Sequence, residues 1–257
     1  MNTARLIYLD DAKAFGIWLM VLGHQSLPGN LHTMIYSFHM PLFFVISGMF
    51  FRPNKSLADN LNGAVKTIMV PYLLLSIINL SICWIHPYLH PELYYGMTGW
   101  RMFSSAILGI FLGVDQVTAY SYMPSGPLWF LVAMFWCRVM CAISFKWLRN
   151  EYISSLVVVM VAAIGIWVLP CNLFSLKSAA MALPFYVMGF LIAKVDYVRL
   201  DMYFIPTLIG GVLVLLSPLN GHFMLVYGLF GNNVFVSYLT AFMGSMAIIN
   251  YCCPIKM

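Results

Sequence analysis

Two histidines lie in or beside strongly apolar segments, and they are the first candidates for chemistry in this chain. His24 belongs to the segment AFGIWLMVLGHQSL, residues 14–27, and His39 belongs to TMIYSFHMPLFFVISGMFF, residues 33–51. Ionisable side chains at membrane depth cost free energy and usually mark a pathway or a reaction centre. The intervening residues 28–32 include Pro, Gly and Asn, which favours a tight turn between two antiparallel spans. We therefore expect both imidazoles near the same end of this hairpin.

Lys13 and Asp10 extend the first of these segments into a possible substrate path. Eleven positions separate Lys13 from His24, which places them on nearly the same helix face, about 16 Å apart along the axis. Asp10 lies three residues before Lys13 and can pair with it across one turn. A cation at one mouth suits an anionic substrate, with His24 as general base for a hydroxyl that attacks an acyl group. In the alternative, Lys13 only anchors the helix end and His24 only caps the other end near water.

His39 and Arg138 each have a structural and a functional interpretation. His39 lies beside Pro41 and could donate to a carbonyl that the proline leaves free, or it could position the acceptor or share a proton with His24. Arg138 lies well inside an apolar segment, where it must snorkel, bond to carbonyls or bind an anion. Together with Arg52 and Lys66 it could hold the phosphates of coenzyme A.

Two residues close to predicted loops could contact a sugar. Trp129 stands at the head of an apolar segment and could stack on a sugar ring, although interfacial tryptophans more often anchor a helix. Arg101 lies in a polar region and could bind a sugar acceptor, although solvated loop charges usually have no such role. The six cysteines show no metal-ligand spacing with histidine, so no metal site is expected.

Composition restricts the class of protein. Apolar residues make up 62% of the chain and charged residues 8%, against roughly 25% charged in soluble domains. This excludes a water-soluble globule and predicts an all-α, polytopic membrane helical bundle. The length of 257 residues suffices for about eight spans. The net charge of +5 comes from basic residues between spans, which fits topology signals and argues against a nucleic-acid partner.

Eight transmembrane helices and one short helix are expected. Residues 103–113 are too short to cross and predict a re-entrant or interfacial helix. With a cytoplasmic N-terminus, this count places ten of the thirteen basic residues in the cytoplasm, and a crossing at 103–113 would move five of those ten outside. Both termini are therefore expected in the cytoplasm. The predicted spans are 14–27, 33–51, 67–85, 128–145, 152–169, 178–193, 203–216 and 234–251.

Five stretches of the chain, in the same order, resemble the membrane acyltransferase 3 family, particularly its fucose 4-O-acetylase-like branch. The first two include the histidines discussed above, and the others are distributed over the rest of the chain. The stretches are LDDAKAFGIWLMVLGH at 9–24, IYSFHMPLFFVISGMFF at 35–51, VPYLL at 70–74, GPLWFL at 126–131 and ALPFYVMGFLIAK at 182–194.

The resemblance implies a single membrane domain over residues 1–257 that acts as an O-acyltransferase of the inner or plasma membrane. Such an enzyme transfers acetyl from acetyl-CoA, its donor substrate, to a glycan or lipid-linked sugar of the cell envelope, with no permanently bound cofactor. The family's functional positions correspond here to Lys13, His24, His39 and Trp129, with His24 as the essential histidine. In this role His24 would act as general base or acyl carrier.

Two departures from the family pattern leave other functions open. Relatives carry R-x-x-R before the third span, whereas Lys66 is followed at that spacing by Met69. Relatives also have about ten spans, so this chain is expected to lack the last two helices. The alternatives are a polysaccharide or small-molecule transporter or export component, and an inactive truncated homologue. Against transport, all eight acidic residues fall in predicted loops or at span ends, which leaves no carboxylate relay.

Overall fold

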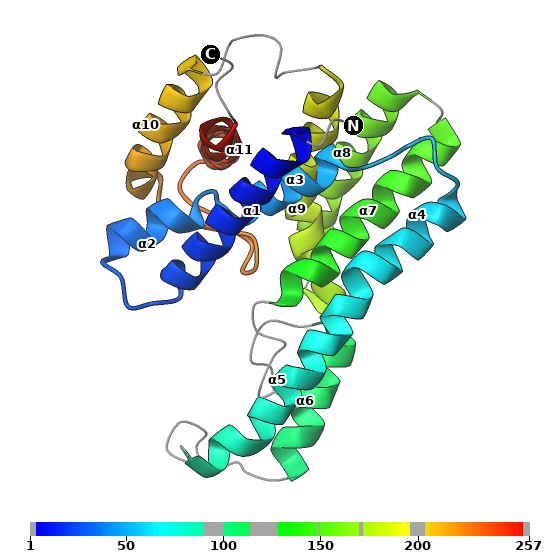
Figure 1. Cartoon of the computed structure of the whole chain (residues 1–257), viewed down its shortest axis with the longest axis vertical. Helices are drawn as coiled ribbons and strands as arrows, with labels where there is room; N and C mark the ends of the chain where they lie inside the picture. The colour runs from blue at the N-terminus through cyan, green and yellow to red at the C-terminus, as the bar shows by residue number, and fades with distance from the viewer. Residues whose placement is uncertain are drawn as a thin grey trace. The chain divides into compact units, whose positions relative to one another are not determined.

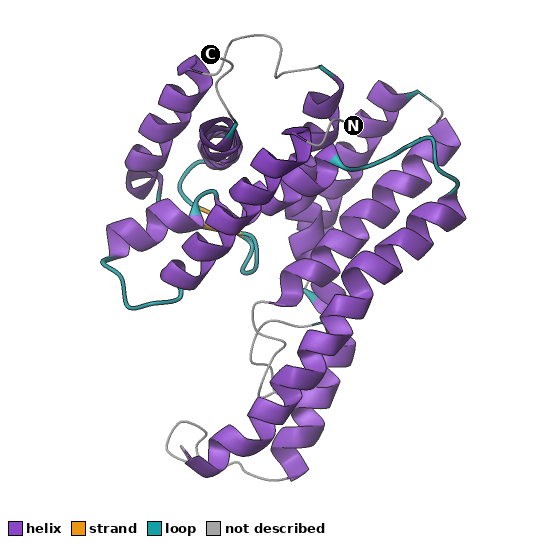
Figure 2. Ribbon diagram, in the orientation of Figure 1, coloured by secondary structure: helices purple, strands orange, loops and turns teal. Residues whose placement is uncertain are grey.

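The protein is almost entirely helical in the computed structural model, which describes residues 4–89, 100–113, 128–148, 150–169, 172–195 and 204–253 (Figures 1 and 2). The chain divides into two compact units. Unit 1 contains Met1–Phe51 and Ala182–Met257, and unit 2 contains Arg52–Met181. The boundary between the units falls inside one helix, α9 (Leu176–Lys194).

Unit 1 combines helices from both ends of the chain. These are α1 (Ala4–Gly23), α2 (Gly29–Tyr36), α3 (His39–Met49), the C-terminal part of α9, α10 (Phe204–Asn220) and α11 (Val234–Cys252). Between α10 and α11, strands β1 (Phe223–Met224) and β2 (Leu229–Phe230) form a two-stranded antiparallel hairpin. Unit 2 contains α4 (Leu57–Ala64), the π-helix η1 (Val65–Met69), α5 (Val70–Leu89), α6 (Trp100–Leu112), α7 (Trp129–Leu148), α8 (Glu151–Val168) and the 3-10 helix η4 (Leu173–Ser175).

Five helical segments among the described residues are long and apolar enough to cross a membrane, which supports the predicted class of multi-pass helical bundle. The described apolar helix α10 is shorter than these five. Helix α6 has 13 residues, fewer than a crossing requires, as the sequence predicted for residues 103–113. The five segments are Leu57–Ser81, Trp129–Leu148, Glu151–Val168, Leu173–Lys194 and Val234–Cys252.

The predicted second span, residues 33–51, is broken into α2 and α3. The chain leaves helical geometry at Phe38, whose φ is −142° and ψ −18°. The hydroxyl of Ser37 donates to the carbonyl of Met34 at 2.7 Å, a local bond of the kind that competes with helix continuation. Pro41 falls in the first turn of α3, where proline is tolerated. The break places His39 at the N-terminus of α3.

Residues 57–66 lie between the predicted spans 33–51 and 67–85, where the sequence suggested a polar connection, but the structure shows them to be helical. Ser56 caps a helix that starts at Leu57, because its hydroxyl accepts from the backbone N–H of Asp59 at 3.0 Å. The same hydroxyl donates to the Asp59 carboxylate at 2.7 Å. The helix continues through η1 into α5, so the predicted third span is the later part of a longer helical segment.

Glycines allow helices of unit 1 to approach backbone to backbone. A Cβ on Gly48 of α3 would overlap the carbonyl of Tyr186, and a Cβ on Gly189 of α9 would overlap the carbonyl of Val45. Small residues permit such close helix packing in membrane proteins. Helices α3 and α9 therefore pack closely against each other.

Candidate active site

Four histidines and one tyrosine lie close together in unit 1. We call His24, His32, Tyr36, His39 and His222 the histidine cluster. The residues come from the end of α1, from α2, from the start of α3 and from the connection between α10 and α11. The cluster therefore confirms that His24 and His39 lie near the same end of their hairpin, and it adds three residues to them.

Tyr36 lies at the centre of the histidine cluster. Its ring stacks on the ring of His32, with centroids 4.0 Å apart and planes 22° apart. His39 meets the same ring edge-on at 4.8 Å, and His24 lies 6.1 Å from it. His222 completes the group, because its ring meets that of His32 edge-on at 6.0 Å.

Gly23, the last residue of α1, makes room for this arrangement. A Cβ at Gly23 would lie 3.1 Å from the ring of Tyr36 and 3.3 Å from the side chain of Ile35. These distances are shorter than ordinary van der Waals contact, so a larger residue would push α2 away from the end of α1. The glycine thus lets the ring of Tyr36 reach the residue that follows, His24.

Backbone carbonyls fix the protonation of two imidazoles. The Nδ1 atom of His24 lies 2.7 Å from the carbonyl of Met20, and Nδ1 of His39 lies 2.9 Å from the carbonyl of Ile35. A carbonyl only accepts, so each Nδ1 must carry the hydrogen. In a neutral ring the free lone pair then lies on Nε2, which is the atom available to take a proton. The carbonyl bonded by His39 belongs to Ile35, four residues before it, at the break between α2 and α3.

Thr33 fixes the third imidazole in the same way. Its hydroxyl donates to the carbonyl of Gly29 at 2.9 Å, which uses its only hydrogen. The same oxygen lies 3.0 Å from Nδ1 of His222 and must therefore accept from it. His222 consequently also presents Nε2 as its free nitrogen.

The connection that carries His222 is itself held by asparagines at the ends of two helices. The side-chain oxygen of Asn220 accepts from the backbone N–H of Asn233 at 2.9 Å, and its amide donates to the hydroxyl of Ser237 at 2.7 Å. Gly221 and Gly231 have φ of 83° and 66°, a left-handed geometry that glycine adopts without steric cost. These contacts fix the base of the loop on which His222 lies.

Access to the four rings differs. His39 is 1% exposed and is therefore a buried part of the packing, whereas His24 and His222 are exposed. His32 is half-buried on α2, which has eight residues and is too short to cross a membrane. Its burial, and then the proximity of His222 and His24, lower the pKa of His32 below its ordinary value. The neutral form of His32 is therefore favoured.

The histidine cluster lies in a part of the sequence without formal charge. Residues 14–51 and 204–253 contain no Asp, Glu, Lys or Arg. The predicted pair of Asp10 and Lys13 is confirmed on the earlier part of α1, with Lys13 Nζ 2.8 Å from the carboxylate. The same ammonium lies 5.0 Å from the ring centroid of Phe50. Asp10 and Lys13 therefore precede His24 by about three to four helical turns.

Arg138, one of the predicted phosphate-binding residues, is set into the interface of α4 and α7 in unit 2. A Cβ on Gly63 would lie 2.6 Å from its Nη2 atom, so the guanidinium occupies space that only a glycine leaves free. The Nε atom of Arg138 is buried without a hydrogen-bond partner among the described residues. The side-chain oxygen of Asn60, on the same helix as Gly63, is likewise buried and unpartnered there. Unit 2 thus contains both a buried donor and a buried acceptor without a partner among the described residues.

The remaining predicted residues are distributed over unit 2. Arg52 and Lys66 are exposed, and Lys66 lies in the π-helix η1. Trp129 begins α7 and is 7% exposed, so its ring is buried in the packing. Arg101 lies in the first turn of α6, and its side chain is outside the described part of the structure.

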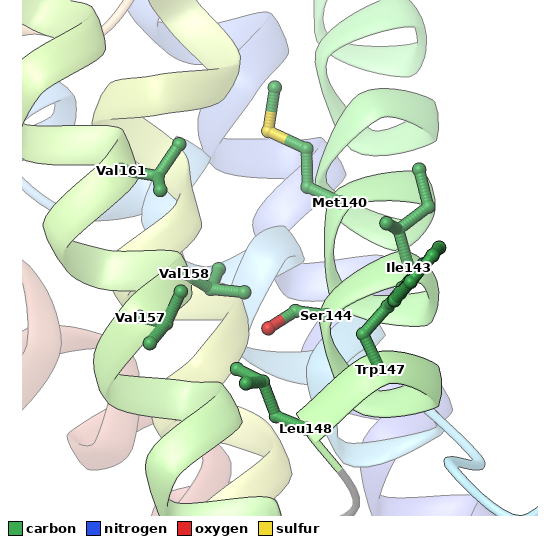
Figure 3. A pocket seen from close by; sticks show the side chains of 8 residues that line it. All are labelled: Met140, Ile143, Ser144, Trp147, Leu148, Val157, Val158 and Val161. Carbon is green, nitrogen blue, oxygen red and sulfur yellow. The ribbon is translucent and has the colours of Figure 1, made fainter.

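An apolar groove of about 400 Å³ lies between α7 and α8 (Figure 3). Its only polar lining side chain is Ser144, whose hydroxyl donates to the carbonyl of Ser154 at 3.3 Å. None of its lining residues can exchange a proton near neutral pH, so the groove is not a reaction centre. Its lining residues are Met140, Ile143, Ser144, Trp147, Leu148, Val157, Val158 and Val161.

The described residues contain no group of three or more His, Cys, Asp or Glu side chains that could hold a metal ion. Cys137 and Cys141 are buried on α7, and the thiol of Cys137 donates to the carbonyl of Ala179 at 3.5 Å. Their burial fits a packing role.

The family model that describes an acyltransferase domain, that of acyltransferase 3, matches residues 6–255. Because this match covers nearly the whole sequence, the chain belongs to the acyltransferase 3 family and is a membrane acyltransferase. Neither the comparison with curated proteins nor that with solved structures finds a match.

Three residues of the histidine cluster were missed by sequence reasoning. His32 and Tyr36 are separated by four positions, a spacing that places them on one helix face, so their pairing could have been found. Tyr36 and His39 are separated by a break that the apolar pattern did not reveal. His222 follows a glycine in a distant connection, and nothing in its local sequence points to Thr33.

Proposed function

We propose that this protein is an integral membrane O-acyltransferase that transfers acetyl from acetyl-CoA to a hydroxyl of a cell-envelope sugar. The observation that supports this most is the anchoring of His24. Its Nδ1–H is bonded to the carbonyl of Met20, and its exposed ring lies 6.1 Å from the ring of Tyr36, with Nε2 as the nitrogen that this bond leaves free. That geometry fits a general base that requires one free nitrogen in a fixed direction.

The reaction conserves the single proton that His24 handles. Nε2 removes the proton of the acceptor hydroxyl as the oxygen attacks the thioester carbonyl. The carbon–sulfur bond then breaks, and the imidazolium returns the proton to the departing thiolate of coenzyme A. The buried ring of His39, edge-on to Tyr36, holds that ring in place and can share the proton.

Coenzyme A carries phosphates, and four basic residues are separate candidates to bind one of them. These are Lys13 on α1 and Arg52, Lys66 and Arg138 in unit 2. Support for Arg138 comes from its buried and unpartnered Nε, since an anion would satisfy it. Trp129 and Arg101 are retained as candidate contacts for the acceptor.

The proposed topology has eight spans with both termini in the cytoplasm of an inner or plasma membrane. In that topology, the connection after α1 and the connection after α10 share one side of the membrane. The 3.0 Å contact between Thr33 and His222 supports this parity, because it joins these two regions. The donor then reaches the site from the cytoplasmic side and the acceptor from the opposite side.

The test is acetyl transfer by the purified full-length protein in liposomes, supplied with radiolabelled acetyl-CoA and envelope glycan. His24→Gln is expected to reduce the transfer rate at least a thousandfold, because glutamine cannot accept the proton. Gln25→Ala, at the adjacent exposed position, is the matched control and should retain the rate. Full activity of His24→Gln, with normal membrane insertion, would overturn the proposal.

A further inference from the structure

His222 has no assigned role in the reaction above, yet a hydrogen bond to Nδ1 fixes the orientation of its ring, as it does for His24. Its Nδ1–H is bonded to Thr33, whose own hydrogen is committed to Gly29. Such anchoring orients an imidazole and leaves one nitrogen in a fixed direction. The ring is exposed, so this nitrogen can be reached by a substrate.

The exposed imidazoles of His24 and His222 each neighbour one ring of a stacked aromatic pair. His24 neighbours Tyr36 at 6.1 Å, His222 neighbours His32 at 6.0 Å, and Tyr36 and His32 stack on each other at 4.0 Å. The stacked pair is half-buried, so part of each ring is accessible. A cyclic molecule with several hydroxyls could contact the rings and donate a hydrogen bond to each Nε2.

The electrostatics of this surface discriminate between acceptors. A neutral imidazole presents a lone pair at Nε2, which attracts a hydroxyl hydrogen and repels the lone pairs of a carboxylate. The two sequence ranges that build the cluster, 14–51 and 204–253, carry no Lys or Arg to offset the desolvation of an anion. The lowered pKa of His32 also disfavours a compensating imidazolium.

We propose that His222 is an acceptor-positioning residue, held by Thr33, and that the histidine cluster selects a neutral, hydroxyl-rich acceptor over an anionic one. This inference rests on the proposed acyltransferase function and adds to it a binding residue and a charge preference. In this arrangement, His24 activates one hydroxyl of the acceptor while His222 accepts a hydrogen bond from another. Thr33 acts through His222 and does not contact the acceptor.

The experiment uses the full-length protein in nanodiscs with radiolabelled acetyl-CoA and paired acceptors. Each pair contains a neutral methyl hexoside and the uronate of the same configuration, such as methyl glucoside with methyl glucuronide. The neutral member is expected to have a kcat/KM at least tenfold higher. Equal or better use of the uronates would overturn the charge preference.

Variants separate positioning from folding. His222→Asn keeps an N–H for Thr33 but lacks the Nε2 lone pair, and it should raise KM for the acceptor about tenfold without changing KM for acetyl-CoA. Thr33→Val should act in the same direction but less strongly. Thr67→Val is its matched control, because Thr67 makes the same bond to a glycine four residues before it, the carbonyl of Gly63 at 2.7 Å. His222→Lys should shift the preference towards the uronates.

Acceptor binding measured without donor distinguishes the two proposals. Saturation-transfer NMR should detect the neutral hexosides on the wild-type protein and a loss of that signal in His222→Asn. Binding without any acetyl transfer would refute the proposed function and leave the acceptor site standing. Transfer that is unchanged in His222→Asn, or an equal rise in KM for both substrates, would refute the acceptor site and leave the function standing.

Discussion

The hydroxyl of Thr33 lies 3.0 Å from Nδ1 of His222, although 189 positions separate the two residues in the sequence. This contact joins α2 to the connection between α10 and α11. It therefore builds the site from both ends of the chain, as unit 1 itself is built. Neither part alone would orient both exposed imidazoles.

Replacement of His39 should separate its structural from its chemical contribution. His39→Ala removes the donor to the carbonyl of Ile35 and leaves a cavity in a buried position, so the free energy of unfolding should fall by about 2–4 kcal/mol. His39→Asn can place its amide N–H near the position of Nδ1 and should lose less. Thermal unfolding in nanodiscs, followed by fluorescence, measures both variants. Equal losses would show that the bond to Ile35 contributes little.

Neighbouring glycines on α10 should respond oppositely to the same substitution. A Cβ on Gly210 would overlap the carbonyl of Met243 on α11, whereas Gly211 has no other atom within 4 Å of that position. Gly210→Ala should therefore destabilise the protein by about 1–3 kcal/mol through overpacking. Gly211→Ala should be neutral or stabilising by up to about 1 kcal/mol, because alanine favours helix. Similar unfolding midpoints for both variants would contradict this packing of α10 on α11.

Gly63→Ala should disturb the proposed donor site without removing a charge. The added methyl would lie 2.6 Å from Nη2 of Arg138 and must displace the guanidinium. If Arg138 binds a phosphate of coenzyme A, KM for acetyl-CoA should rise about fivefold, equivalent to about 1 kcal/mol. Gly165→Ala in α8, where the added carbon makes only ordinary contacts, is the control. An unchanged KM in Gly63→Ala, with Arg138→Gln also unaffected, would exclude Arg138 from donor binding.

The stability of the protein should depend on pH through His32. Its pKa is lowered in the folded state, so the unfolded chain takes up the proton first as the pH falls below about 6.5. The stability conferred by a neutral His32 is present above that pH and is lost progressively below it. Thermal midpoints measured from pH 8 to pH 5 should therefore fall less steeply for His32→Gln than for the wild type. Parallel curves would contradict the lowered pKa.

Much of the architecture was predictable because it follows from composition and short-range spacing. The apolar runs that became α7, α8, α9 and α11 were located to within a few residues, since long hydrophobic segments predict helices directly. The ion pair of Asp10 and Lys13 also followed from a three-residue spacing. Helix α4 was missed because its polar residues suggested a loop, although Ser56 and Asp59 carry a capping pattern.

The candidate site was only half predictable, because half of it depends on contacts between distant segments. His24 and His39 stood out as ionisable residues in apolar surroundings. His222 could not be predicted as part of the site, since its place there depends on the contact with Thr33 and therefore on how α10 and α2 pack. Similarly, the sequence identified Arg138 as unusual but could not show that Gly63 is the residue that makes space for it.

The π-helix η1 at residues 65–69 affects which deletions the proposed donor site around Arg138 can tolerate. A π-turn accommodates one residue more than an α-helix needs, so deletion of a single residue there could restore regular hydrogen bonding between α4 and α5. Because the extra residue is confined to the π-turn, such a deletion would leave the faces of α4 and α5 in register. A deletion between Gly63 and the π-turn would instead rotate Gly63 by about 100° away from Arg138 and close the slot occupied by the guanidinium.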